Sequence, residues 1–92
     1  MAMALARHIL LKSIQEAERL QQQLAQGADF AQLAKKHSRC ASAKRGGDLG
    51  EVRPGQLVTA VDRVIFRQAL HRVHGPVKSR FGYHLIEVIF RQ

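Results

Sequence analysis

One stretch of the chain, from Ser42 to Leu57, most constrains how it can fold. It reads SAKRGGDLGEVRPGQL and has a turn signal on each side of a short apolar segment. Gly46 and Gly47 can take positive φ at no steric cost, so the backbone can bend sharply there. In 53–55, Arg-Pro-Gly, proline fixes φ at the second position of a turn and glycine fills the third. We therefore expect a short strand at about 49–52, held between two turns.

The chain is short enough to form one domain, and we predict a single domain over residues 1–92. A chain of this size buries about 60–65% of the surface that its unfolded form exposes. The sequence has no run of about 18 apolar residues, so no membrane helix is predicted. The N-terminal segment MAMALARHILLK lacks the features of a signal peptide and is expected to be the first strand. Cys40 has no partner for an internal disulfide, which together with the missing signal points to the cytoplasm. We also expect a monomer.

The charge of the chain is strongly positive. Its 15 Lys and Arg residues against 7 acids give a net charge of +8. Five basic residues and no acid lie between Lys35 and Arg45, and again between Arg63 and Arg80. Such a field attracts polyanions and acidic partners, although it can also serve solubility alone. The aromatic residues that would stack on bases are not interleaved with these charges, so we do not expect a dedicated nucleic-acid reader. Weak binding of acidic or nucleic-acid partners stays open.

The first half of the chain predicts a strand followed by helices. Residues 5–11 are apolar on both faces of a strand, which is typical of a central strand. Ser13 with Glu16 forms a capping box for a first helix, which Gly27 is placed to end. Asp29 with Gln32 repeats the pattern for a second helix. We expect a loop or a short helical turn at 39–43.

The second half predicts one further helix and two strands. Leu57, Val61, Val64 and Ile65 have helical spacing. Residues 68–74 show no strong pattern, 75–77 form a short strand, and 83–90 form the last strand after a turn at Phe81-Gly82. The resulting order of strand, helices, strand, helix, strand and strand predicts an α+β fold with helices packed around a small antiparallel sheet.

Two histidines occupy similar positions on the first and last strands. His8 shares a strand face with Leu10, and His84 shares one with Ile86 and Val88. If the two strands are neighbours, the imidazoles lie side by side and can supply donor and acceptor to each other as neutral tautomers. A lone histidine on an apolar face is usually a packed core residue. Two histidines and a single cysteine, Cys40, favour a site without excluding the core interpretation.

Two other kinds of chemistry are poorly supported. A zinc site needs three or four protein ligands, and the chain has one cysteine and no HxxxH or CxxC pattern, so we expect no metal. A cysteine hydrolase needs an activated thiolate, an orienting third group and an oxyanion hole. No local signature of such an enzyme surrounds Cys40.

Four stretches of the chain resemble a known family in order and spacing. They are HILLK at 8–12, GADFAQLAKKHS at 27–38, KRGGDLGE with PGQL in the central stretch, and FGYHLIEV at 81–88. Together they are similar to the parvulin family of peptidyl-prolyl cis/trans isomerases, and specifically to its small single-domain bacterial members. The resemblance implies a four-stranded antiparallel sheet surrounded by helices in the order βαααβαββ. It also implies proline-containing peptides or unfolded segments as partners and no cofactor.

The resemblance assigns roles to eight residues. It implies a polar centre formed by His8, Cys40, Ser79 and His84. It also implies a pocket for the proline ring formed by Leu49, Leu57, Val61 and Phe81. This chain departs from its relatives at two of these positions. Relatives commonly have Met at position 57 and Phe at position 61. Leu for Met conserves volume, but Val for Phe removes a ring wall, so we expect a wider pocket or one that is filled from elsewhere.

The chemistry implied by the resemblance breaks no bond. Rotation about an Xaa–Pro amide has a barrier of about 18–20 kcal/mol, and an enzyme can bind the twisted amide better than either planar form. We expect the apolar residues to hold the ring above a floor of hydrogen-bonding groups, with Cys40 as a weak hydrogen-bonding group. Some parvulins bind a phosphorylated residue through a basic loop after the first strand. Here only Lys12-Ser13 precede the helix, which suggests a phosphate-independent enzyme.

Two alternatives to the isomerase remain. The first is a parvulin-fold peptide-binding or chaperone module with weak or no isomerase activity, which Val61 keeps open. The second is a basic domain that attaches to nucleic acid or ribosomes, whose binding would depend steeply on salt.

Overall fold

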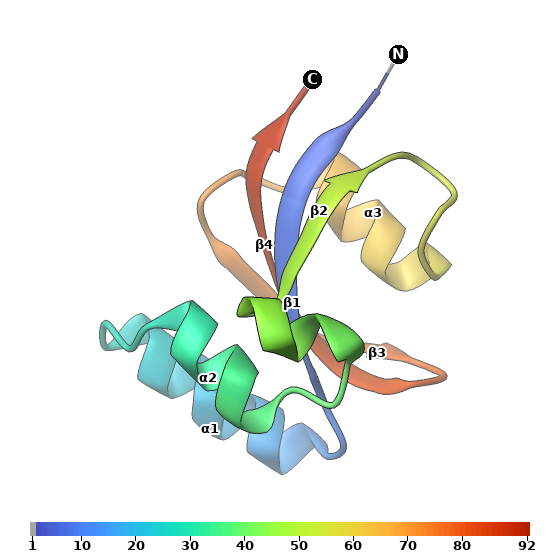
Figure 1. Cartoon of the computed structure of the whole chain (residues 1–92). Helices are drawn as coiled ribbons and strands as arrows, with labels where there is room; N and C mark the ends of the chain where they lie inside the picture. The colour runs from blue at the N-terminus through green and yellow to red at the C-terminus, as the bar shows by residue number, and fades with distance from the viewer. Residues whose placement is uncertain (1) are drawn as a thin grey trace.

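The computed structural model describes residues 2–92, which form one four-stranded antiparallel sheet with helices against it (Figure 1). The strands run in the order β2-β1-β4-β3. This is the predicted α+β architecture. None of the described helices is long and apolar enough to cross a membrane. The elements in chain order are β1 (Ala4–Leu11), α1 (Ile14–Ala25), α2 (Phe30–His37), the 3-10 helix η1 (Ala41–Arg45), β2 (Asp48–Val52), α3 (Thr59–Arg67), β3 (Val73–Ser79) and β4 (Gly82–Arg91).

The first strand is central, as its two apolar faces predicted. β1 pairs with β2 on one side and with β4 on the other. Successive side chains of a strand point to opposite faces of the sheet, so β1 contributes to two cores. Ile9 and Leu11 pack with Leu85 against α1 and α2, whereas Ala6 packs with Ile86 against α3. The helices therefore cover opposite faces of the sheet.

The predicted helix caps are present. The Ser13 side-chain oxygen accepts a hydrogen bond from the Glu16 amide at 3.2 Å, and the Asp29 carboxylate accepts one from the Gln32 amide at 3.0 Å. Each bond satisfies one of the amides that the first turn of a helix leaves free. Gly27 follows the end of α1 with a positive φ of 100°, as expected for a residue that ends a helix.

Three predicted boundaries were wrong. β3 is Val73–Ser79, two residues longer at each end than the predicted 75–77, and α3 begins at Thr59, so Leu57 precedes the helix. β3 is an edge strand whose register with β4 shifts between His74 and Val77. Such an irregularity removes the two-residue alternation by which a strand is recognised in a sequence. Leu57 follows the turn at 53–55, and its apolar character reflects its packing beside α3 rather than helical periodicity.

The double glycine of the central stretch lies against the backbone of β1. Gly46 and Gly47 have φ of 68° and 85°, which is the left-handed region. The Gly47 carbonyl accepts a hydrogen bond from the His8 amide at 3.0 Å. A side chain at Gly47 would collide with the His8 carbonyl oxygen, and its Cβ would lie 3.1 Å from the Cβ of Ala34. The glycine thus allows the chain to pass directly over His8.

We predict that Gly47→Ala destabilises the protein more than Gly50→Ala. Both glycines have positive φ, so each substitution should cost about 1–2 kcal/mol in backbone strain. At Gly47 the collision with His8 should add about 1–3 kcal/mol, whereas an added Cβ at Gly50 meets no atom within 4 Å. The free energy of unfolding in urea measures both costs. Equal costs for the two variants would show that the contact with His8 is not tight.

Candidate functional site

A small apolar cavity opens on the α3 face of the sheet, where β1, β2 and β4 meet the start of α3. Its volume is about 240 Å³. Strands, loops and helix each contribute to its wall, which makes it a product of the whole fold. It is lined by His8, Leu10, Cys40, Leu49, Leu57, Val58, Val61, Phe81 and His84.

The floor of the cavity contains a pair of hydrogen-bonded histidines. The Nδ1 atoms of His8 and His84 lie 3.2 Å apart, and the two rings are nearly parallel, with 16° between their planes. Both residues are buried, with 6% and 3% of their surface exposed. β1 and β4 are neighbours, so the condition for the two imidazoles to lie side by side is met.

Ser79 extends this pair into a chain of hydrogen bonds. Its hydroxyl lies 2.6 Å from Nε2 of His84 and also accepts the Phe81 amide at 3.1 Å. If Ser79 donates to His84, the Nδ1–H of His84 donates to His8, and His8 carries its proton on Nε2. In the reverse order, Nδ1–H of His8 donates to Nδ1 of His84, and Nε2–H of His84 donates to the Ser79 hydroxyl. In either order, Nε2 of His8 ends the chain and is buried without a partner among the described residues.

The surroundings of the histidines favour their neutral forms. The pKa of His8 is lowered from 6.5 to about 4, mainly by burial and in addition by the proximity of His84. Burial also lowers the pKa of His84. A desolvated imidazolium lacks the solvation that water would give it, and a second one beside it adds repulsion. At neutral pH the floor is therefore uncharged, yet it can donate and accept hydrogen bonds.

Cys40 reaches the cavity because the preceding residues are bonded to β1. The Leu10 amide donates to the Ser38 hydroxyl at 3.0 Å, and the Leu10 carbonyl accepts the Arg39 amide at 2.8 Å. These bonds place Cys40, just before η1, beside the side chains of His8 and Leu10. Its thiol is free and half-buried. No group of three or more potential metal ligands is found among residues 2–92.

Apolar side chains from three different elements form the walls. Leu49 comes from β2, Val61 from α3, and Phe81 from the turn between β3 and β4. Val61 is 2% exposed and closes the cavity at the back, whereas Phe81 is 58% exposed and stands at its mouth. The result is an apolar pocket with one open side, above a neutral hydrogen-bonding floor.

The structure brings together all eight residues that the sequence singled out. Seven line the cavity directly, and Ser79 joins them through its bond to His84. Leu10 and Val58 also line the cavity and were not among the residues expected from the sequence. Leu10 was recognisable as a neighbour of His8 on the same strand face, because residues two apart on a strand share a face. Val58 follows Leu57 before α3 begins, where no periodicity indicates which side chains point inward.

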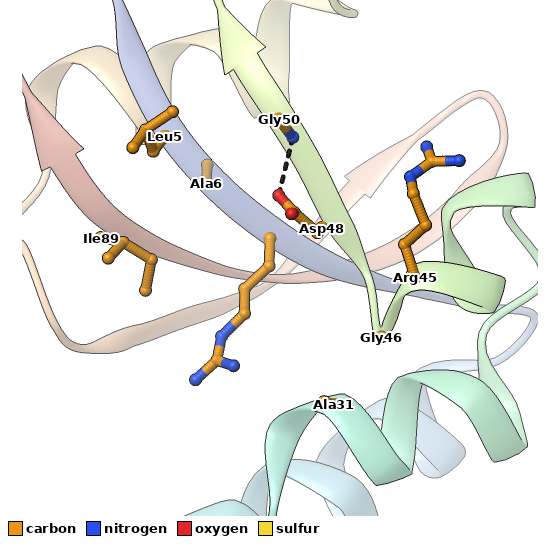
Figure 2. Close-up of a pocket in the computed structure, with 9 residues that line it drawn as sticks. Leu5, Ala6, Ala31, Arg45, Gly46, Asp48, Gly50 and Ile89 are labelled. Atoms are coloured by element: carbon orange, nitrogen blue, oxygen red, sulfur yellow. Dashed lines mark hydrogen bonds between the residues drawn. The ribbon is translucent and has the colours of Figure 1, made fainter.

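A larger hollow on the other side of the molecule lacks these features (Figure 2). Its volume is about 390 Å³, and it lies between β1, β2 and α2. Figure 2 shows the carboxylate of Asp48 turned toward the amide of Gly50, with which it forms a 2.8 Å hydrogen bond, and Arg45 extending away from Ala31. The polar groups of this hollow therefore do not converge on one point, and the histidine cavity is the better candidate site.

Comparison with known proteins decides the family. A family model for the rotamase, or PPIC-type PPIase, domain matches residues 8–89. The chain belongs to this family. The match includes all eight candidate residues, from His8 to His84, and the parvulin resemblance read from the sequence is confirmed.

Solved structures and curated sequences of the PPIC-type family agree. The structure matches the parvulin NmPin of Nitrosopumilus maritimus with a TM-score of 0.88, at 33% identity and over 98% of both chains. It matches the peptidylprolyl isomerase PrsA of Bacillus anthracis with a TM-score of 0.95, at 30% identity, over 99% of this chain and 42% of that one. The chaperone SurA of Legionella pneumophila strain Lens is 44% identical over 96 residues, which are 94% of this chain and 22% of the chaperone. The chain thus spans roughly a fifth to a third of the curated relatives that it matches.

We predict that the histidine pair makes stability fall in acid. The unfolded chain binds a proton at His8 near pH 6.5, whereas the folded chain does so only near pH 4. The free energy of unfolding should therefore be constant above about pH 6.5 and fall by about 3 kcal/mol between that pH and 4 from this residue. Urea unfolding over this range measures the loss, and imidazole NMR resonances report the pKa directly.

The matched variant for this prediction is His8→Gln, which keeps hydrogen-bonding groups and cannot titrate. Its stability should depend less steeply on pH between 6.5 and 4 than that of the wild type, although it is less stable throughout. A His8 resonance that titrates near pH 6.5 in the folded protein would contradict the neutral pair.

Proposed function

We propose that this chain catalyses the cis/trans isomerisation of Xaa–Pro peptide bonds in unfolded or exposed segments. The observation that carries the proposal is the apolar cavity above a buried, neutral histidine pair, in a chain of the PPIC-type PPIase family. The proline ring enters the cavity between Phe81 at its mouth and Val61 at its back. The peptide bond before the ring then lies near the histidine floor.

The cavity would lower the barrier by favouring the twisted amide over the planar one. Resonance makes the planar amide polar, and twisting the C–N bond removes this resonance. An apolar pocket disfavours the more polar planar form more strongly, so the twisted form is bound relatively better. His8 and His84 contribute hydrogen-bonding groups without placing a full charge beside the reacting bond. No covalent bond forms or breaks in this scheme.

Cys40 contributes in this scheme as a weak hydrogen-bonding group. A thiol is a weak donor and a weak acceptor, which suits an amide whose polarity changes during rotation. Isomerisation also needs no nucleophile, because the reactant and the product differ only in the rotation of one bond.

The substrate in this proposal carries no phosphate. The connection between β1 and α1 consists of Lys12 and Ser13, and the Ser13 hydroxyl is used to cap α1. One lysine on such a short connection does not form the cluster of cations that binds a dianionic phosphate in a bidentate way.

A peptide-binding module with weak catalysis is the second candidate, and Val61 favours it. Val61 provides less wall than an aromatic ring would, so a bound proline is held less tightly for rotation. The curated relatives include chaperone SurA of Legionella pneumophila and foldase protein PrsA of Geobacillus sp.. In this alternative the cavity holds proline-containing segments of unfolded proteins and releases them unchanged.

The first test is exchange NMR on short Ala–Pro and Leu–Pro peptides without phosphate. Wild-type protein at substoichiometric concentration should accelerate exchange between the cis and trans resonances well above the uncatalysed rate, which corresponds to tens to hundreds of seconds. Shifts of peptide resonances without faster exchange would support the binding module. If the peptide resonances neither shift nor exchange faster, the result contradicts both candidates.

A second test concerns Cys40. We expect Cys40→Ser to lower kcat/KM by less than about tenfold, because it exchanges one hydrogen-bonding group for another. Removal of a group that took part in bond making or proton transfer would cost about 10²–10⁴-fold. Complete loss of turnover in a variant that NMR shows to be folded would count against the proposed role, and Cys40→Asp tests the same position with a stronger acceptor.

A third test compares two valines of α3. We expect Val61→Phe to raise kcat/KM, because a ring at this position restores a wall of the cavity. Its cost in stability should be near the lower end of the usual 1–3 kcal/mol for overpacking, since the ring can extend into the cavity. Val64→Phe is the control, because Val64 is buried on the same helix but does not line the cavity. If Val61→Phe instead lowers kcat/KM to the same extent as Val64→Phe, the cavity is already the right size for its ligand.

A further inference from the structure

A second hollow adjoins the candidate site and shares part of its wall. Its volume is about 420 Å³, and Leu57 and Val58 separate it from the histidine cavity because they line both. It lies between the start of α3 and the turn that joins β3 to β4, which face each other in the fold (Figure 1). Its lining consists of Leu57, Val58, Thr59, Ala60, Ser79 and Arg80.

Unlike the histidine cavity, this hollow has polar walls. Thr59 contributes a hydroxyl, Ser79 contributes another, and Arg80 contributes a full positive charge. Ser79 also bonds to His84 at 2.6 Å, so the hollow begins one residue from the histidine pair. A ligand that lies across Leu57 and Val58 would therefore contact an apolar pocket at one end and a polar, cationic one at the other.

The charge of Arg80 is held at the boundary between the two hollows. Its guanidinium carbon lies 4.9 Å from the centre of the Phe81 ring, a cation–π contact. Phe81 in turn forms the mouth of the histidine cavity. No Asp or Glu is among the residues that line either hollow. Asp62, one turn along α3, accepts a hydrogen bond from the Gly55 amide at 2.9 Å. Arg80 thus places a positive charge beside Phe81, and no carboxylate is among the residues that line the two hollows.

We propose that the second hollow binds the residue next to the proline and that Arg80 selects an acidic side chain there. This inference rests on the proposed function. Adjacent residues of a peptide are 3.8 Å apart between Cα atoms, so a residue flanking a bound proline is close enough to reach across the shared wall. A guanidinium binds a carboxylate through charge-assisted hydrogen bonds in a planar geometry. The substrates selected are therefore proline segments with Asp or Glu beside the proline.

The test uses peptides that differ only in charge beside the proline. Glu, Gln or Lys is placed directly before the proline in one series and directly after it in a second. Exchange NMR gives kcat/KM for each peptide, and chemical-shift titration gives its Kd. For wild type, the Glu peptide of at least one series should exceed its Gln counterpart by about three- to fivefold, the size expected of a solvent-exposed ion pair. High salt should reduce this ratio.

Variants of Arg80 are compared by the ratio between peptides, so any change in overall activity cancels. Arg80→Gln should bring the Glu-to-Gln ratio to about one, and Arg80→Glu should reverse the preference toward the Lys peptide. Arg19→Gln is the control. It removes one positive charge from an exposed position of α1, on the opposite face of the sheet, and should keep the wild-type ratio.

The failure of this inference is distinguishable from the failure of the proposed function. If wild type isomerises all peptides with a Glu-to-Gln ratio of one, Arg80 selects nothing and the isomerase stands. The same holds if Arg80→Gln keeps the wild-type preference. If no peptide is isomerised, the Kd values still decide, since equal Kd values for Glu and Gln peptides overturn the inference. An equal loss of preference in Arg19→Gln would show that only the net charge acts.

Discussion

The register between β1 and β4 is the constraint on which the rest of the structure depends. Leu10 lies opposite His84 and His8 lies opposite Ile86, so the two imidazoles are diagonal neighbours on one face. A shift of one residue would turn every side chain of a strand to the other face. It would expose Ile9 and Leu11 to the cavity and bury His8 in the core beneath α1 and α2. Because apolar side chains pack on both faces, the two cores fix the register of β1 and β4. The register in turn places the two histidines of the site.

The polar groups on the two faces of the sheet differ in burial and in charge. On the α1 and α2 face, Arg7 and Glu87 are direct cross-strand partners joined at 2.6 Å, and Arg7 also lies over the Phe30 ring. These are partly exposed contacts of the kind that contribute modestly to stability. On the α3 face, the polar groups are instead buried and neutral, and Nε2 of His8 has no partner among the described residues. Such a group lowers stability, so it is more easily understood as part of a site than as part of a core.

Much of this site was predictable from local patterns, and the rest depended on tertiary contacts. The apolar faces of residues 5–11 predicted a central strand, and the pairing of that strand with β4 in the structure places His8 beside His84. The caps at Ser13 and Asp29 were visible because they act within one turn of a helix. The start of β3 was not predictable, because an irregular edge strand has no clear alternation of apolar and polar residues. The hollow at Arg80 was not predicted either, since it needs the start of α3 to face a turn some twenty residues later. The roles of the site residues, the cytoplasmic location and the monomeric state stay predictions.

The positions of the charged and neutral groups suit the proposed selection of an acidic residue and the proposed rotation of the peptide bond beside it. A cation inside the histidine cavity would lose its solvation and would raise the cost of polar groups around it. Arg80 avoids this cost because it is exposed and is positioned by the outer side of the site, against Phe81. The cavity behind Phe81 can then stay apolar and uncharged, which is the condition that disfavours the planar amide. In the proposed function, separating the charge from the rotating bond would allow one small domain to recognise an acidic neighbour without making the pocket itself polar.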